Sequence, residues 1–410
     1  MKNKSLTPQI RFKGYDDEWQ QAKVRDVFTL GNGYTPSKAN PAFWTNGTIP
    51  WFRMEDIREN GRVLADSIQH VTPEAVKSSG LFPAGSIIVS TTATIGEHAL
   101  LIADSLANQR FTVFQTVNRW SWLKAKYLLY RFYGLGDWCR KNVNAGGLAA
   151  VSITDLQKYD IDFPSTAEER DSIADYFDNI DKLLVDTERE ITRLEKMKQA
   201  SLQKMFPRPG ETTPEIRFDG FTEPWKKIRL SQIGEVRMCK RILKSQTNEQ
   251  GEVPFYKIGT FGKSPDAYIS YDLFEEYKRL YSFPKKGDVI ISAAGTIGRS
   301  VVYDGKPAYF QDSNLIWLEN DNKIVDNTFL ATVLPMINWA SSSTTISRIY
   351  NETVRQTYII APSSIEEQKS ISRYFRNLDA IISAKRKKLE KLQNLKQSCL
   401  DKMFVNTTAQ

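Results

Sequence analysis

The stretch PSTAEERDSIADYFDNIDKLLVDTEREITRLEKMKQASLQKMF, residues 164–206, decides the fold, because it returns without a gap as residues 362–404. The two copies are identical at 17 of 43 positions, and both end in Leu-x-Lys-Met-Phe. Such a repeat is too long for a solenoid unit and indicates a duplicated domain. Apolar residues recur every three or four positions in each copy, which predicts a long helix that packs against another helix.

The apolar stripe has the same heptad phase in both copies. We predict that the packing residues are Phe177, Ile180, Leu184, Ile191 and Leu194 in the first copy, and Phe375, Leu378, Ile382, Leu389 and Leu392 in the second. Two related domains can lie about a pseudo-twofold axis, in which case the helices would form an antiparallel coiled coil. Apolar residues on the other helix faces exceed what one seam covers, so helices of a partner protein are expected to dock there. These additional residues are Leu183, Met197, Leu202, Leu395 and Leu400.

Each predicted helix begins with a candidate capping box. Ser165 with Glu168, and Ser363 with Glu366, have the Ser-x-x-Glu spacing in which each side chain accepts a hydrogen bond from the other residue's backbone N–H. Pro207 and Pro209 end the first helix.

Outside the helices, each half mixes short β-like runs with Gly, Pro and Asn turns. Residues 86–90, 110–114, 289–292 and 314–318 are typical of strands, and residues 124–140 of an amphipathic helix. We expect an α+β fold made of two duplicated globular α/β domains joined by the two long helices. The predicted boundaries are residues 1–160 for the first domain, 161–206 for the central helix, 207–213 for a linker, 214–360 for the second domain and 361–405 for the distal helix.

Composition narrows the class of protein. A net charge of +8 and a pI near 9.1 favour an anionic partner such as nucleic acid. Three distant cysteines and only two histidines, His70 and His98, argue against a disulfide framework, a metal site or a His-based catalytic triad. No apolar run approaches the roughly 18 residues of a membrane helix, and we expect a cytoplasmic protein.

Three fragments imitate enzyme motifs without completing them. Asn40-Pro41-Ala42-Phe43 is one residue away from an amino-methyltransferase signature, but no glycine-rich S-adenosylmethionine loop accompanies it. Asp266, Glu276 and Lys278 imitate nuclease carboxylates and lysine, and the first half has nothing similar. Residues 259–264 lack the glycine that a phosphate loop needs at Lys257, so a turn is expected.

The order and duplication of these elements resemble the specificity subunits of type I restriction–modification systems, over essentially the whole chain. The first-half motifs are residues 33–37 (GYTPS), 49–51 (IPW), 85–90, 94–96 (TIG) and 108–109 (NQ); the second-half motifs are residues 253–255 (VPF), 287–292, 295–298 (GTIG) and 310–314 (FQDSN). The Thr-Pro-Ser element has no close counterpart near residues 238–244, which is expected if the domains read different sequences.

The resemblance implies a non-catalytic subunit in which each globular part is a target recognition domain for one half of a bipartite, asymmetric site in double-stranded DNA. The helices would set the spacer and dock two adenine-N6 methyltransferase subunits, and two motor–nuclease subunits would join the complex. S-adenosylmethionine, ATP and Mg²⁺ would belong to those partners.

Base edges are read by Arg, Lys, Asn and Gln, so the polar loop residues are the candidates for DNA contacts. They are Arg53, Asn108, Gln109 and Arg110 in the first domain, and Lys240, Arg241, Lys257, Thr296, Arg299, Gln311 and Asn314 in the second. Trp44, Trp51 and Tyr256 are either core residues or platforms for an extruded base. Residues 385–388 (KRKK) are either a solvated helix face or a contact to spacer phosphates. The alternatives to this function are a self-contained nuclease or methyltransferase with duplicated DNA-binding domains, and a coiled-coil scaffold that needs no DNA.

Overall fold

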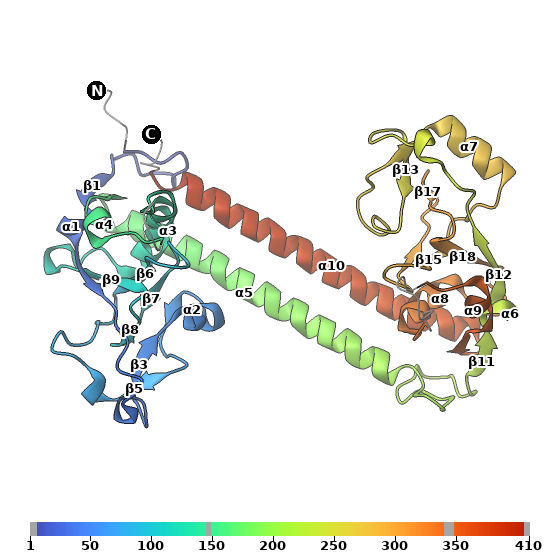
Figure 1. Cartoon of the computed structure of the whole chain (residues 1–410), viewed down its shortest axis with the longest axis horizontal. Helices are drawn as coiled ribbons and strands as arrows, with labels where there is room; N and C mark the ends of the chain where they lie inside the picture. The colour runs from blue at the N-terminus through green and yellow to red at the C-terminus, as the bar shows by residue number, and fades with distance from the viewer. Residues whose placement is uncertain (1–5, 145–148, 340–347, 406–410) are drawn as a thin grey trace. The chain divides into compact units, whose positions relative to one another are not determined.

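The computed structural model describes residues 6–144, 149–339 and 348–405, and it divides the chain into two compact units (Figure 1). Unit 1 comprises residues 1–188 and 387–410, and unit 2 comprises residues 189–386. The two 38-residue helices, α5 (Ala167–Lys204) and α10 (Ile365–Lys402), therefore each contribute residues to both units. The predicted α+β fold class, with duplicated domains and two long helices, is confirmed.

Unit 1 contains a five-stranded sheet, a three-stranded sheet and a two-stranded ribbon. Their orders are β2-β9-β6-β7-β4, β5-β3-β8 and β1-β10. The strands are β1 (Gln20–Lys23), β2 (Phe28–Asn32), β3 (Ile49–Phe52), β4 (Val63–Leu64), β5 (His70–Val71), β6 (Ile87–Ser90), β7 (His98–Leu101), β8 (Leu106–Ala107), β9 (Phe111–Thr116) and β10 (Asp160–Phe163). The helices are α1 (Val24–Val27), α2 (Met54–Asn60), α3 (Ala125–Lys141), α4 (Ile153–Leu156) and the 3₁₀ turns η1 (Pro41–Phe43), η2 (Pro73–Ala75) and η3 (Asn118–Trp120).

Unit 2 repeats this plan with a four-stranded sheet, a three-stranded sheet and a ribbon. Their orders are β12-β18-β15-β16, β14-β13-β17 and β11-β19. The strands are β11 (Lys226–Arg229), β12 (Gly234–Met238), β13 (Val253–Tyr256), β14 (Tyr268–Ile269), β15 (Val289–Ser292), β16 (Ser300–Val302), β17 (Tyr309–Phe310), β18 (Leu315–Asn320) and β19 (Tyr358–Ala361). The helices are α6 (Leu230–Ile233), α7 (Tyr271–Leu280), α8 (Asn327–Val333), α9 (Asn351–Gln356) and the turns η4 (Lys244–Gln246) and η5 (Leu334–Met336).

The long helices run antiparallel within each unit. Contacts between them show this, since residues further along α5 contact residues earlier in α10. In unit 2, Glu190 binds Lys385 at 2.6 Å, Lys198 binds Asp379 at 2.5 Å and the Ser201 hydroxyl lies 2.9 Å from that of Tyr374. In unit 1, the Lys396 ammonium lies 2.5 Å from Asp181 and the Tyr176 hydroxyl lies 3.3 Å from the Cys399 sulfur.

The predicted stripe forms the inner face of these helices. Of its ten members, Phe177, Ile180, Ile191, Phe375, Leu378 and Ile382 are buried, and Leu184, Leu194, Leu389 and Leu392 are half-buried. Thr187, the polar position in the first copy, is also buried, and its hydroxyl donates to the Leu183 carbonyl at 2.6 Å.

The Met-Phe ends of the two helices complete hydrophobic cores. Phe206, at the end of α5, packs edge-to-face on Trp225 in unit 2, with ring centres 5.7 Å apart. Phe404, at the end of α10, does the same with Trp19 in unit 1 at 6.3 Å. Each unit therefore joins its globular part to the end of the other repeat's helix.

The capping-box prediction was wrong by one residue. Thr166 and Ser364 cap the helices, accepting hydrogen bonds from the N–H groups of Glu169 and Glu367 at 3.4 and 3.3 Å. Ser165 instead donates to the Glu18 carbonyl at 2.8 Å. The glutamates three residues after the true caps do not reach back, because each binds an arginine of the segment that precedes the first strand. These bidentate pairs, with Nε–carboxylate distances of 2.7 Å, are Arg11–Glu169 and Arg217–Glu367.

The buried histidine of unit 1 makes stability depend on pH. His98 is 1% exposed, and its Nε2 lies 2.8 Å from the Leu129 carbonyl. Desolvation, helped by the nearby Arg62 guanidinium, lowers the pKa of His98 from 6.5 to about 3. Between these values the unfolded chain binds a proton that the folded chain excludes.

We therefore expect unit 1 to lose stability as the pH falls from about 6.5 toward 3, by about 1.4 kcal/mol per pH unit from this group. The stability that unit 1 gains from keeping His98 neutral is fully present above about pH 6.5. Denaturant unfolding of the wild type and of His98→Gln across this window measures it, and the variant should show the shallower slope. Equal slopes would contradict the assignment to His98.

Candidate nucleic-acid interface

In each unit, polar candidates lie side by side where two parallel strands end. In unit 2, β13 and β17 are parallel, and Lys257 and Gln311 are the first residues beyond them. The Gln311 N–H donates to the Tyr256 carbonyl at 2.9 Å, and its side-chain oxygen accepts from the Ile258 N–H at 3.0 Å. The ends of parallel strands lie at one sheet edge, so residues 54 positions apart become neighbours.

Unit 1 has the same arrangement. Arg53 and Asn108 follow the parallel strands β3 and β8, and the Asn108 N–H donates to the Phe52 carbonyl at 3.0 Å. The Asn108 side chain accepts from the Arg110 N–H at 3.0 Å, which shapes the turn and leaves Gln109 and Arg110 exposed. Arg53 is only 22% exposed and lies over the Trp51 ring at 5.6 Å.

Four second-domain candidates line a single cavity of about 740 Å³. They are Arg241, Lys257, Gln311 and Asn314. Arg348 also lines it and donates to the Ser313 carbonyl at 2.9 Å. Sequence reasoning missed Arg348, because its place is set by a β-bridge to Ala294, which no local pattern reveals.

The charges of this cavity are nearly balanced. Its cationic side chains are Arg241, Lys244, Lys257 and Arg348, and its carboxylates are Glu249, Asp266 and Asp312. Lys257 binds Asp266 and Arg241 binds Asp312, each at 2.9 Å. These carboxylates hold the two cations in place while the remaining donors stay available.

Three other second-domain candidates do not line this cavity. The Lys240 ammonium lies 5.0 Å from the Tyr281 ring centre, and Arg299 donates to the Phe261 carbonyl at 2.9 Å. Thr296 is exposed in the turn between β15 and β16, where Gly298 needs a positive φ of 79°. The hydrogen bond to Phe261 connects Arg299 to the loop that follows Lys257.

Of the aromatic candidates, Trp51 belongs to the packed interior, whereas Trp44 and Tyr256 are half-buried at its margin. Trp51 is 2% exposed, donates to the Tyr34 carbonyl at 2.9 Å and meets Trp44 edge-to-face at 5.0 Å. Tyr256 stacks on Phe310 with ring centres 6.0 Å apart. The core interpretation agrees with the burial of Trp51, and for the half-buried Trp44 and Tyr256 both interpretations stay predictions.

The fragments that imitate enzyme motifs have structural partners. Asn40 caps the 3₁₀ turn η1 by accepting from the Ala42 N–H at 3.1 Å, and residues 257–263 form hydrogen-bonded turns around Thr260. Asp266 pairs with Lys257, whereas Lys278 pairs with Glu275 at 3.3 Å. Across residues 6–144, 149–339 and 348–405, no three His, Cys, Asp or Glu side chains are grouped as metal ligands would be. The three cysteines are free and buried.

Apolar side chains remain exposed on the outer faces of the helices. In unit 1 these are Leu183, Val185 and Leu395, and in unit 2 Met197 and Ile381, each 41–47% exposed. Two residues predicted for these faces lie inward instead: Leu400 is buried in the core of unit 1 and Leu202 packs against that of unit 2. In the basic run, Lys385 and Arg386 bind Glu190 and Glu195, while Lys387 and Lys388 are exposed.

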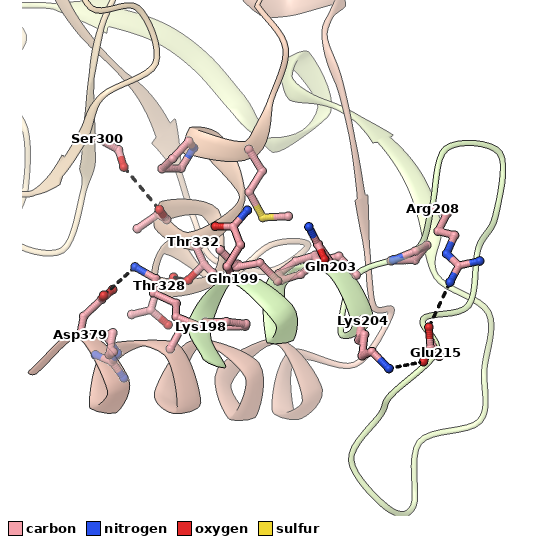
Figure 2. Close-up of a pocket in the computed structure, with 18 of the residues that line it drawn as sticks. Lys198, Gln199, Gln203, Lys204, Arg208, Glu215, Ser300, Thr328, Thr332 and Asp379 are labelled. Atoms are coloured by element: carbon pink, nitrogen blue, oxygen red, sulfur yellow. Dashed lines mark hydrogen bonds and ion pairs between the residues drawn. The ribbon is translucent and has the colours of Figure 1, made fainter. Parts of the chain in front are cut away.

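A groove of about 1140 Å³ lies beside the end of α5 in unit 2 (Figure 2). In Figure 2, Gln199 and Gln203 of α5 and Thr328 and Thr332 of α8 line the groove, whereas Lys204 points toward Glu215, which it binds at 2.7 Å. Leu202, Val302, Ala331 and Met336 supply apolar lining, and the ion pair between Lys198 and Asp379 lies at one end.

The fold and the polar loops at the ends of the parallel strands define a tandem pair of α/β domains that share two long helices. A family model described as "Type I restriction modification DNA specificity domain" matches residues 16–196 and again residues 222–394. The chain belongs to this family.

Two relatives are similar over parts of the chain. A putative type I restriction enzyme specificity subunit of Haemophilus influenzae is 52% identical over 148 residues, covering 36% of this chain and 38% of the relative. The EcoprrI specificity subunit of Escherichia coli is 46% identical over 162 residues, covering 39% and 40%. The chain thus spans about two fifths of the length of these relatives.

One solved structure shares the fold across nearly the whole chain. The S subunit of a type I restriction–modification system from M. genitalium has a TM-score of 0.64 at 15% identity, covering 98% of this chain and 100% of that one. Separately, no helix in the described part of the chain is long and apolar enough to cross a membrane.

Proposed function

We propose that this chain is the DNA-specificity subunit of a type I restriction–modification complex. Each globular part reads one half of a bipartite, asymmetric site in double-stranded DNA, and the chain itself carries out no catalysis. The observation that carries the proposal is the pair of equivalent loop edges, Arg53 with Asn108 and Lys257 with Gln311, in a chain whose family is a DNA-specificity domain. Such side chains read base edges in the major groove.

The partners of this function are two methyltransferase subunits, which modify adenine at N6, and two motor–nuclease subunits. S-adenosylmethionine, ATP and Mg²⁺ are bound by those partners in this proposal. DNA of the chromosome is the substrate, so the complex works in the cytoplasm. The enzymatic alternative is not favoured, because Asp266 and Lys278 bind separate partners.

The test is co-expression with the cognate methyltransferase subunit in a methylation-free host, followed by single-molecule sequencing of the genome. One bipartite motif with N6-methyladenine on both strands is expected, and it should vanish when this chain is omitted. A stable complex without any new methylation would refute the proposed function.

The exposed apolar residues of the helices are expected to dock the methyltransferase. Replacing Met197 and Leu395, 43% and 46% exposed, by glutamate should reduce co-purification of that subunit at least about 10-fold, because a carboxylate buried without a partner is costly. The control is Gln393→Glu, which adds a carboxylate at an exposed polar position of α10. Equal recovery of the complex from all variants would place the docking surface elsewhere.

The helices are also expected to set the spacer between the half-sites. Seven residues inserted after Glu188 and seven after Arg386 lengthen both antiparallel partners by about 10 Å, which corresponds to about three base pairs of DNA. Genome methylation should then show a spacer longer by at most about three base pairs, between unchanged half-sites. A changed half-site sequence would contradict this role.

A further inference from the structure

Two polar side-chain pairs occupy equivalent places in the duplicated domains. β2 and β12 pair with β9 and β18 in the same antiparallel register: Phe28 is opposite Thr116, and Gly234 is opposite Asn320. Both strands are five residues long. The third residue beyond β2 is Thr35, and the third beyond β12 is Arg241.

The opposite members of the pairs are also equivalent. β8 and β17 pair in parallel with β3 and β13 in the same register, and both end two residues before the second partner. That partner is Gln109 in unit 1 and Asp312 in unit 2. The Thr35 hydroxyl donates to the Gln109 side-chain oxygen, and the Arg241 Nε donates to Asp312 Oδ2 at 2.9 Å. One position in the fold thus carries a neutral pair in the first domain and an ion pair in the second.

The ion pair with Asp312 engages only the Nε of the Arg241 guanidinium. Asp312 is 15% exposed and fixed near the loop, whereas the Arg241 side chain is 67% exposed. Within the part of the chain that the structure describes, the only bond of Arg241 is through Nε, so both terminal amino groups are available. This is not general in unit 2: Arg237 binds Glu319 through Nε and Glu235 through a terminal nitrogen.

We propose that these two pairs are base-reading pairs of their domains, and that Arg241 recognises a guanine in the half-site of the second domain. This inference rests on the proposed function and names the chemistry of one base contact. Guanine presents two acceptors, O6 and N7, in the major groove, and a planar guanidinium with two free amino groups matches them. Asp312 is a positioning residue, because its bond to Nε fixes the plane of the guanidinium and reduces the entropy lost on binding.

The neighbourhood suits this contact. Gln311 and Asn314 flank Asp312 in the same cavity, and Lys257 lies there with its own carboxylate partner. The first domain has Thr35 at the position of Arg241. It therefore reads the equivalent base with the hydroxyl of Thr35 and the amide of Gln109 instead of a guanidinium. The two half-sites are therefore expected to differ at this position.

The test compares genome methylation motifs of the full complex carrying single substitutions. The wild type should show a guanine in the second domain's half-site, and Arg241→Lys or Arg241→Ala should make that one position degenerate. The preference for guanine over other bases should fall about 10- to 100-fold, the usual worth of a bidentate contact. Lysine should not restore the preference for guanine, because an ammonium group does not present two coplanar N–H donors as a guanidinium does.

Substitutions at Asp312 test whether this residue positions Arg241 or has only a structural role. Asp312→Asn keeps an acceptor for Nε and should retain part of the guanine preference, whereas Asp312→Ala should lose it at the same single position. Gln109→Ala should alter only the other half-site, and Arg237→Ala, whose arginine also binds a carboxylate through Nε, should alter neither. Thermal unfolding and co-purification should match the wild type for the Arg241 variants.

The outcomes distinguish two failures. A wild-type motif whose second half lacks guanine, or Arg241 variants with an unchanged motif, would overturn this inference and leave the proposed function intact. An absence of any methylation motif in the wild type would instead refute the proposed function.

Discussion

Replacing Arg241 and Lys257 together by glutamate is expected to abolish methylation by the proposed complex without preventing its assembly. Both side chains line the cavity at the loop edge of unit 2, and each is held by an aspartate at 2.9 Å. Glutamate would place four carboxylates where two ion pairs now lie, facing the negative charge of DNA. Losing a base contact, losing a cation and adding repulsion should together reduce methylation by about 100-fold or more.

The control for this variant changes the charge equally elsewhere. Lys306 and Lys323 are also paired with aspartates, at 3.4 and 2.9 Å, and lie outside the cavity at 85% and 81% exposure. The Lys306→Glu, Lys323→Glu variant should methylate DNA as the wild type does, at matched ionic strength. Full methylation by the Arg241→Glu, Lys257→Glu variant, measured by single-molecule sequencing, would show that this cavity is not part of the DNA interface.

Arg131→Met is expected to destabilise unit 1 by about 3–5 kcal/mol, the usual cost of breaking a buried ion pair. Arg131 on α3 and Asp162 on β10 are 1% and 0% exposed and bind each other directly. Arg131 also donates to the Asp162 carbonyl at 3.3 Å and to the Tyr159 hydroxyl at 3.2 Å. Methionine fills similar volume but leaves the Asp162 carboxylate without its cation.

Hydrogen–deuterium exchange of α3 and β10 measures this change within unit 1. Arg237→Met, which removes the exposed ion pairs with Glu235 and Glu319 in unit 2, should leave the exchange of α3 and β10 unchanged. Adding Asp162→Leu to Arg131→Met should recover much of the loss, because both charges are then gone. Wild-type exchange in the single variant would show that the pair adds nothing to stability.

The helices were predictable because their information is local and duplicated. A stripe at 3-4 spacing needs no knowledge of distant residues, and Phe177 and Phe375 are buried as the stripe requires. The caps were missed by one residue because two adjacent hydroxyl residues precede each helix, and a distant carbonyl, that of Glu18, engages Ser165. Glu169 and Glu367, three residues after the caps, likewise have distant arginine partners, which no local pattern shows.

The candidate interface was less predictable. Residue type selected Arg241, Lys257, Gln311 and Asn314, but the parallel pairing of β13 with β17 is what makes Lys257 and Gln311 neighbours, and Arg241 joins them from beyond the end of β12. The same reasoning selected Arg299, which does not line this cavity and donates one hydrogen bond to the Phe261 carbonyl. Residue type says which side chains can read a base, whereas long-range pairing decides which of them have free donors.

The closing segment of the chain has a consequence for biosynthesis. The core around Trp19, near the start of the chain, includes Cys399, Leu400, Met403, Phe404 and Val405. A ribosome that has finished the first domain has not yet made these side chains, so the core around Trp19 keeps an open apolar surface until α10 has been translated. Of the two domains, the one that is synthesised first thus completes its core only after the second has been made.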